Sequence, residues 1–189
     1  MVNARRASWT VADLAALPRD EYDYELVQGR LIQIAPPTVG HDETRGRLRM
    51  ALQVYADAHG GHAYGADRGF NLTLADEAEE TVLRPAAAYM RDETVATDGH
   101  GYVRRAPDLA VEVVSLSQFR PAMMREKARL WLSRGCCLTW IVWPDRKRIE
   151  VWRDGDARSA RIVHAGDDLD GADVLPGFHH AVADIFEGT

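Results

Sequence analysis

Apolar and polar residues alternate with period two in several short segments of the chain, which predicts β-strands. Residues 24–27 and 31–34 flank Gln28-Gly29-Arg30, so we expect an N-terminal β-hairpin with Gly29 in its turn. A second hairpin is predicted from residues 138–143 and 148–152. The remaining predicted strands cover residues 62–64, 68–74, 83–90, 107–115 and 161–164, and a Gly/Asp-rich loop follows the last of them.

Apolar residues at helical spacing predict two main helices. Residues 42–59 place Leu48, Leu52 and Tyr55 on one face, and residues 122–134 form the second helix, which ends at Gly135. Short helices are predicted over 11–17 and 181–186. The pattern is α+β, with a central mixed sheet and flanking helices, and we expect a single domain over residues 1–189 in which residues 1–9 are flexible.

Composition adds few constraints beyond ordinary solubility. Hydrophobic residues make up 46% and charged residues 28%, and no apolar run is long enough to span a membrane. The basic N-terminus has no apolar segment behind it, so it does not resemble a signal peptide. Cys136 and Cys137 are adjacent, and we interpret them as core residues at the start of a strand. We therefore expect a cytoplasmic protein that has no membrane partner.

The formal net charge of −6 argues against a protein that coats nucleic acid by neutralising phosphates. It does not argue against a nuclease, because a cationic cleft can lie on an acidic body. Arginines do cluster, as in Arg45, Arg47 and Arg49 of the first long helix, although most such clusters are solvated surface.

The strongest chemical signal is Glu112, which interrupts the apolar strand Pro107-Asp108-Leu109-Ala110-Val111-Glu112-Val113-Val114-Ser115. An ionised carboxylate in a buried strand is costly unless a cation or metal faces it. Lys127 follows in the next helix, on a face that is otherwise apolar. A strand acid beside a lysine is typical of metal-dependent phosphodiester cleavage. The alternatives are a structural ion pair of Glu112 and a Lys127 that extends past its neighbours to water.

Asp108 is a weaker candidate metal ligand, because it lies four residues before Glu112 on the same strand. Four strand steps span about 13 Å, whereas two carboxylates that share one ion lie within roughly 4–5 Å. A turn or hydrogen-bonding role after Pro107 is the favoured interpretation of Asp108.

An ordered set of motifs resembles one known family. The set runs from Tyr24-Glu25-Leu26-Val27-Gln28-Gly29-Arg30-Leu31 through Pro36-Pro37, His41, Gly69-Phe70, Arg84-Pro85, the Glu112 strand and Arg125-Glu126-Lys127 to Val174-Leu175-Pro176-Gly177-Phe178. It resembles the Uma2 family of restriction-endonuclease-like proteins. The resemblance implies the PD-(D/E)XK nuclease fold, with a central mixed sheet, flanking helices and an N-terminal hairpin.

The resemblance also implies a site and a cofactor. It implies Mg²⁺ or Mn²⁺ on the Glu112 carboxylate, the Val113 backbone carbonyl and Glu25, with Lys127 assisting the attacking water. Most members of that family place an aspartate where this chain has Ala86, so we expect cleavage that is weak or lost. The implied substrate is nucleic acid, with DNA expected.

Several alternatives stay open at this point. Glu25 belongs either to the site or to a cross-strand pair. His41 either contacts phosphate or shuttles protons near a helix N-terminus, or it is a solvated loop histidine. The whole domain is either a nuclease or a catalytically inactive binding or dimerisation scaffold, for which a homodimer is the simplest assembly.

Overall fold

A computed structural model describes residues 8–18, 22–34, 36, 39–92, 94–114, 121–153 and 160–187, without the side chain of Val39. Its centre is a six-stranded sheet in the order β10-β9-β8-β7-β6-β3. The strands are β3 (His62–Gly65), β6 (Ala87–Met90), β7 (Leu109–Val113), β8 (Leu138–Trp143), β9 (Arg148–Arg153) and β10 (Arg161–His164). Only β7 and β8 pair in parallel among these strands, because α3 (Pro121–Ser133) connects them as a crossover. The mixed sheet and α+β class are confirmed.

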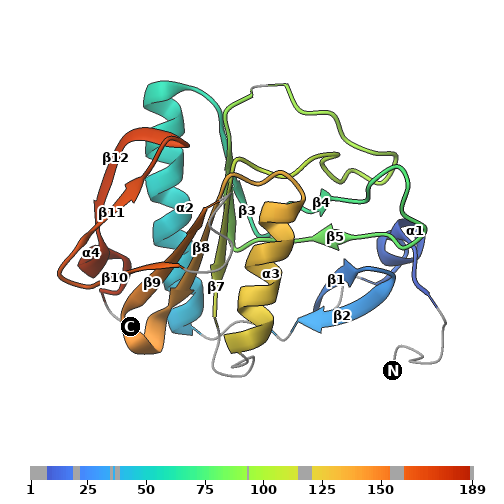
Figure 1. Cartoon of the computed structure of the whole chain (residues 1–189), viewed down its shortest axis with the longest axis horizontal. Coiled ribbons are helices and arrows are strands. Elements are labelled where there is room, and N and C mark those ends of the chain that lie inside the picture. Colours follow the sequence, from blue (N-terminus) through green and yellow to red (C-terminus); the bar gives the residue numbers. More distant parts are fainter. Residues whose placement is uncertain are drawn as a thin grey trace.

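The two main helices cover opposite faces of this sheet (Figure 1). α2 (Val39–His59) packs Leu48 and Leu52 in the same core cluster as Leu109 and Val111 of β7. α3 buries Ala128 and Leu132 against Ile141 on the other face. Since successive strand residues point to opposite faces, the strands from β6 to β9 contribute side chains to the cores on both faces.

A second sheet of four strands, in the order β2-β1-β5-β4, carries the N-terminal hairpin. It contains β1 (Asp23–Val27), β2 (Arg30–Ile34), β4 (Phe70–Asn71) and β5 (Val82–Leu83). Gln28 and Gly29 both have positive φ, at 48° and 70°, as a two-residue type I′ turn requires. The predicted hairpin is therefore confirmed.

α1 (Val11–Ala15) packs against this hairpin, and Thr10 and Asp13 form a capping box at its start. The backbone N–H of Trp9 donates to the carbonyl of Gly29 at 2.7 Å. Of the segment expected to be flexible, residues 1–7 lie outside the described residues. The single domain over residues 1–189 stays a prediction.

Several predicted boundaries are wrong. The expected strand over 83–90 is two strands in different sheets, because Pro85 cannot donate to a ladder and ends β5. The expected strand over 68–74 shortens to Phe70–Asn71, and α2 begins at Val39 rather than at residue 42. Cys136 is buried but Cys137 is exposed, so only one of the two is a core residue.

The predicted C-terminal loop contains a hairpin, β11 (Asp168–Gly171) with β12 (Leu175–Ala181), before α4 (Val182–Ile185). Leu169, Leu175 and Phe178 extend the core on the α2 side of the sheet. Within the described ranges, no helix is both long enough and apolar enough to cross a membrane.

Candidate functional site

β7 delivers Glu112 to the face of the sheet that α3 covers. Leu109, Val111 and Val113 belong to the α2-side core, so the period of two turns Glu112 the other way. The residue is buried, with 5% of its surface exposed. A carboxylate so deeply placed needs partners, and the next segment of chain provides them.

α3 supplies two partners from positions one helical turn apart. The Lys127 Nζ lies 2.9 Å from the Glu112 Oε2, and the Trp131 indole N–H donates to the Glu112 Oε1 at 2.8 Å. Residues i and i+4 share a helix face, which is why both reach the same carboxylate. The apolar pattern of this helix did not predict that Trp131 also donates a hydrogen bond to the buried acid.

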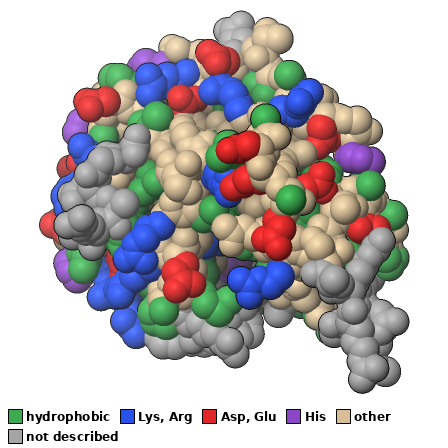
Figure 2. All heavy atoms as spheres, turned by 45° about the vertical axis from the view of Figure 1, so that its right-hand side comes forward, with side chains coloured by type: hydrophobic (Ala, Val, Ile, Leu, Met, Phe, Trp, Pro, Cys, Tyr) green, Lys and Arg blue, Asp and Glu red, His purple; other side chains and the backbone are tan. Residues whose placement is uncertain are grey.

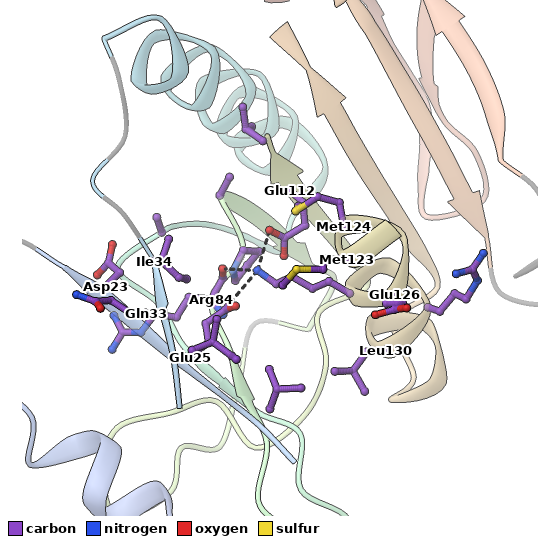
Figure 3. A pocket seen from close by; sticks show the side chains of 18 of the residues that line it. Asp23, Glu25, Gln33, Ile34, Arg84, Glu112, Met123, Met124, Glu126 and Leu130 are labelled. Atoms are coloured by element: carbon purple, nitrogen blue, oxygen red, sulfur yellow. Dashed lines mark hydrogen bonds and ion pairs between the residues drawn. The ribbon is translucent and has the colours of Figure 1, made fainter. Parts of the chain in front are cut away.

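The hairpin brings a second acid to the same ammonium. The Glu25 Oε1 lies 2.8 Å from the Lys127 Nζ and also accepts the backbone N–H of Arg84 at 2.6 Å. The Lys127 Nζ is 3.5 Å from the carbonyl oxygen of Arg84. One lysine of α3 thus joins β7, the strand that precedes it, to β1, which lies about one hundred residues earlier in the sequence. Figure 3 shows Glu25, Glu112 and Arg84 converging there.

Glu112 is buried among charged groups, and burial disfavours the ionised form of its carboxyl. Desolvation, with a contribution from the Glu25 charge, raises the pKa of Glu112 to about 7 despite the attraction of Lys127. Desolvation opposes the charge of Lys127, yet Glu112 and Glu25 together raise the pKa of its ammonium above the ordinary value. Near neutral pH the Lys127 ammonium is therefore charged, and the Glu112 carboxyl is partly protonated.

This shift predicts how stability depends on pH. Between the ordinary pKa of 4.5 and about 7, the native state binds more protons at Glu112 than the unfolded state does. The stability contributed by this carboxyl is complete below pH 4.5 and is lost as the pH rises through about 7. We expect Glu112→Gln to gain in Tm relative to the wild type between pH 5 and pH 8, measured by thermal unfolding. A difference that stays constant with pH would contradict this.

Trp131 allows a direct test of how the carboxylate is held. Trp131→Phe removes the N–H donor to Glu112, and Trp140→Phe is a matched control, since both rings are fully buried. The Trp140 indole nitrogen has no hydrogen-bond partner among the described residues. We expect Trp131→Phe to lower the free energy of unfolding by about 1.5–3 kcal/mol more than the control does, in urea denaturation. Equal losses would show that the bond to Glu112 contributes nothing.

His41 lies in the first turn of α2, not in a loop, and reaches β7. Its Nε2 lies 2.7 Å from the carbonyl oxygen of Val113, so Nε2 carries the proton. Burial, opposed by this hydrogen bond, lowers the pKa of His41. Its Nδ1 is buried and has no hydrogen-bond partner in the described part of the chain. The carbonyl predicted as a metal ligand is thus engaged by a neutral histidine.

Asp108 is placed away from these groups, at the start of β7. Its carboxylate accepts the backbone N–H of Arg91 at 2.9 Å and lies 3.5 Å from the Arg91 guanidinium. Ala86, in contrast, lines the same cavity as Glu112 and adds no polar side chain to it.

Glu25, Glu112, Lys127 and His41 line an open cavity of about 790 Å³. In Figure 3, Asp23, Gln33 and Ile34 stand on the hairpin side, and Met123, Met124 and Leu130 stand on the α3 side. Four arginines also line it: Arg30 of β2, Arg45 of α2, Arg84 of the link between β5 and β6, and Arg129 of α3. Acidic and basic side chains are interspersed over the face seen in Figure 2, so the cations of this cavity act locally.

Similarity to known proteins extends over most of the chain. The Uma2 family model, described as "Putative restriction endonuclease", matches residues 11–183. No curated protein matches the chain. The chain is similar to the solved structure of "a putative nuclease belonging to DUF820 from Anabaena variabilis ATCC 29413", with 17% sequence identity and a TM-score of 0.75. The match covers 94% of this chain and 97% of that one, and the predicted restriction-endonuclease-like fold is confirmed.

Proposed function

The chain belongs to the Uma2 family of restriction-endonuclease-like proteins, and from this premise we propose that it hydrolyses phosphodiester bonds of DNA in a reaction that depends on a divalent metal. One observation carries the proposal. Two buried carboxylates, Glu25 and Glu112, meet the ammonium of Lys127 within 3 Å in an open cavity. Such a convergence of titratable groups in a cavity is typical of an active site.

The donor set fits a hard divalent cation that is held weakly. Carboxylate and carbonyl oxygens are the ligands that Mg²⁺ takes in proteins, and Glu25, Glu112 and the Val113 carbonyl would supply them. When bound, the ion supplies Lewis-acid polarisation of a phosphoryl oxygen and activation of water. Among the described residues no group of three or more His, Cys, Asp or Glu side chains lies together as a metal site.

The remaining steps belong to residues of the chain. Lys127 places a positive charge where a transferred phosphoryl group gains negative charge, and Trp131 and Arg84 fix the two carboxylates that orient this lysine. The neutral ring of His41 carries its proton on Nε2, so Nδ1 is the atom that accepts a proton.

The test is cleavage of supercoiled plasmid by purified protein in Mg²⁺ or Mn²⁺. We expect slow nicking that Glu112→Ala reduces by at least 100-fold. Asp57→Asn, an exposed acid on α2, is the matched control and should cleave like the wild type. Equal cleavage by wild type and Glu112→Ala would identify a contaminating nuclease and overturn the proposal.

The second candidate function is a catalytically inactive scaffold for binding or dimerisation. It is favoured by the same ion pairs, because Lys127 already satisfies both carboxylates and Ala86 adds no third one. Calorimetric titration with Mn²⁺ separates the two functions. A micromolar dissociation constant supports the nuclease, whereas undetectable binding together with absent cleavage supports the scaffold.

A further inference from the structure

We propose that the cavity beside Lys127 accepts one unstacked nucleotide, so that single-stranded or locally unpaired nucleic acid is the substrate class; this rests on the proposed function. The first argument is depth. The side chains of Glu25, Glu112 and Lys127 are only 4%, 6% and 17% exposed, although all three line the cavity. Enzymes that act on an extruded nucleotide hold it in a recessed cavity of this kind, so the low exposure of these groups favours a nucleotide that has left the stack.

The hairpin forms one apolar wall. Tyr24 and Leu26 point to the core beneath α1, so the alternate positions of the hairpin face the cavity. Paired across the two strands on this face are Glu25 with Ile32, and Asp23 with Ile34. Ile32 and Ile34 are half-buried and line the cavity next to the acid. An apolar surface beside the reactive groups suits the flat face of a base.

α3 forms the opposite wall with side chains of similar character. Met123 and Leu130 lie on the same helix face as Lys127, at one turn before and nearly one turn after it, and both line the cavity. Met123 is 46% exposed. Methionine adapts its shape to flat aromatic partners, and flipped or single-stranded bases are held between aromatic or apolar side chains.

Charge and size agree with a nucleotide as the occupant. The volume of about 790 Å³ lies within the roughly 300–1,000 Å³ of cavities that enclose small ligands. Arg30, Arg45 and Arg129 line it from three separate elements, which suits phosphates on both sides of the enclosed nucleotide. The two apolar walls suit a base, and the arginines suit the phosphates of its backbone.

The experiment measures binding without cleavage, on wild-type protein in EDTA. Fluorescence anisotropy compares a labelled 12-nucleotide single strand, the same sequence as a duplex, and that duplex with one unpaired nucleotide. We expect the single strand and the duplex with the unpaired nucleotide to bind at least tenfold more tightly than the regular duplex. Binding that is equal for all three, or tightest for the regular duplex, would overturn the proposal.

Variants test whether the two walls hold the base. Ile32→Ala with Met123→Ala should weaken single-strand binding about tenfold and leave duplex binding unchanged. The matched control is Met50→Ala with Val54→Ala, two exposed apolar residues of α2 outside this cavity. Equal effects of the two double variants would also overturn the proposal. Selective binding without cleavage by the metal-loaded protein would leave the inference standing and refute the nuclease instead.

Discussion

The Lys127→Met variant is expected to lose about 3–5 kcal/mol of its free energy of unfolding, because it leaves two buried carboxylates without their cation. Methionine keeps most of the apolar stem, so the loss reports the charge. The side chains of Lys127, Glu25 and Glu112 are 17%, 4% and 6% exposed, which leaves little solvent to screen them. For a chain of this length the loss corresponds to a fall in Tm of roughly 10 °C, measured by scanning calorimetry.

Two control variants make this result specific. Lys147→Met removes an exposed lysine and should change stability little. Lys127→Met combined with Glu25→Gln and Glu112→Gln removes the uncompensated charges and should recover more than half of the loss. A loss below about 1 kcal/mol for Lys127→Met alone would show that the carboxylates are satisfied without the lysine, and would contradict the electrostatic account of the site.

The same variant links stability to metal binding. With the ammonium removed, the two carboxylates remain held in place by the backbone N–H of Arg84 and the indole of Trp131. A divalent cation then has the position between them open to it. Mn²⁺ should therefore raise the Tm of Lys127→Met more than that of the wild type, by preferential binding to the native state.

Local patterns were sufficient to predict the elements that carry the acid and the lysine. The period-two strand around Glu112 and the helical face of Lys127 could both be read from neighbouring residues. The contact between Lys127 and Glu25 could not, because it joins residues about one hundred positions apart and depends on how the two sheets pack. Glu25 became a candidate through the resemblance to the Uma2 family, and only the structure shows that Lys127 is its partner.

Other errors arise from tertiary context. Pro85 is compatible with a sheet edge, so an apolar run across it gives no sign that the chain changes sheets there. The Gly/Asp-rich segment before α4 has weak strand propensity. It nevertheless forms the β11–β12 hairpin, because Leu169 of β11 and Leu175 of β12 are buried in the core on the α2 side of the sheet. Trp131 illustrates a third limit, since an indole that packs in a core also donates a hydrogen bond there.

The Ala86→Asp variant is expected to bind Mn²⁺ at least tenfold more tightly than the wild type and to cleave plasmid faster. Ala86 lines the cavity with Glu112, and its backbone is fixed by a 2.7 Å hydrogen bond from its N–H to the carbonyl of Val111. A carboxylate at this position adds a third negative ligand to a site that has two, and affinity for hard cations rises with the number of charged oxygens. Calorimetric titration and initial cleavage rates measure the two effects.

Ala66→Asp is the matched control for this change, because Ala66 is also half-buried and lines the same cavity from the turn after β3. It adds the same charge without a place beside Glu112, so its metal affinity should stay close to that of the wild type. In the absence of metal, Ala86→Asp should unfold at a lower temperature than Ala66→Asp, since a third acid near Glu25 and Glu112 adds repulsion. If both variants bind Mn²⁺ equally, the gain comes from charge alone, and the site lacks the geometry of a metal centre in which only the ligand at position 86 is missing.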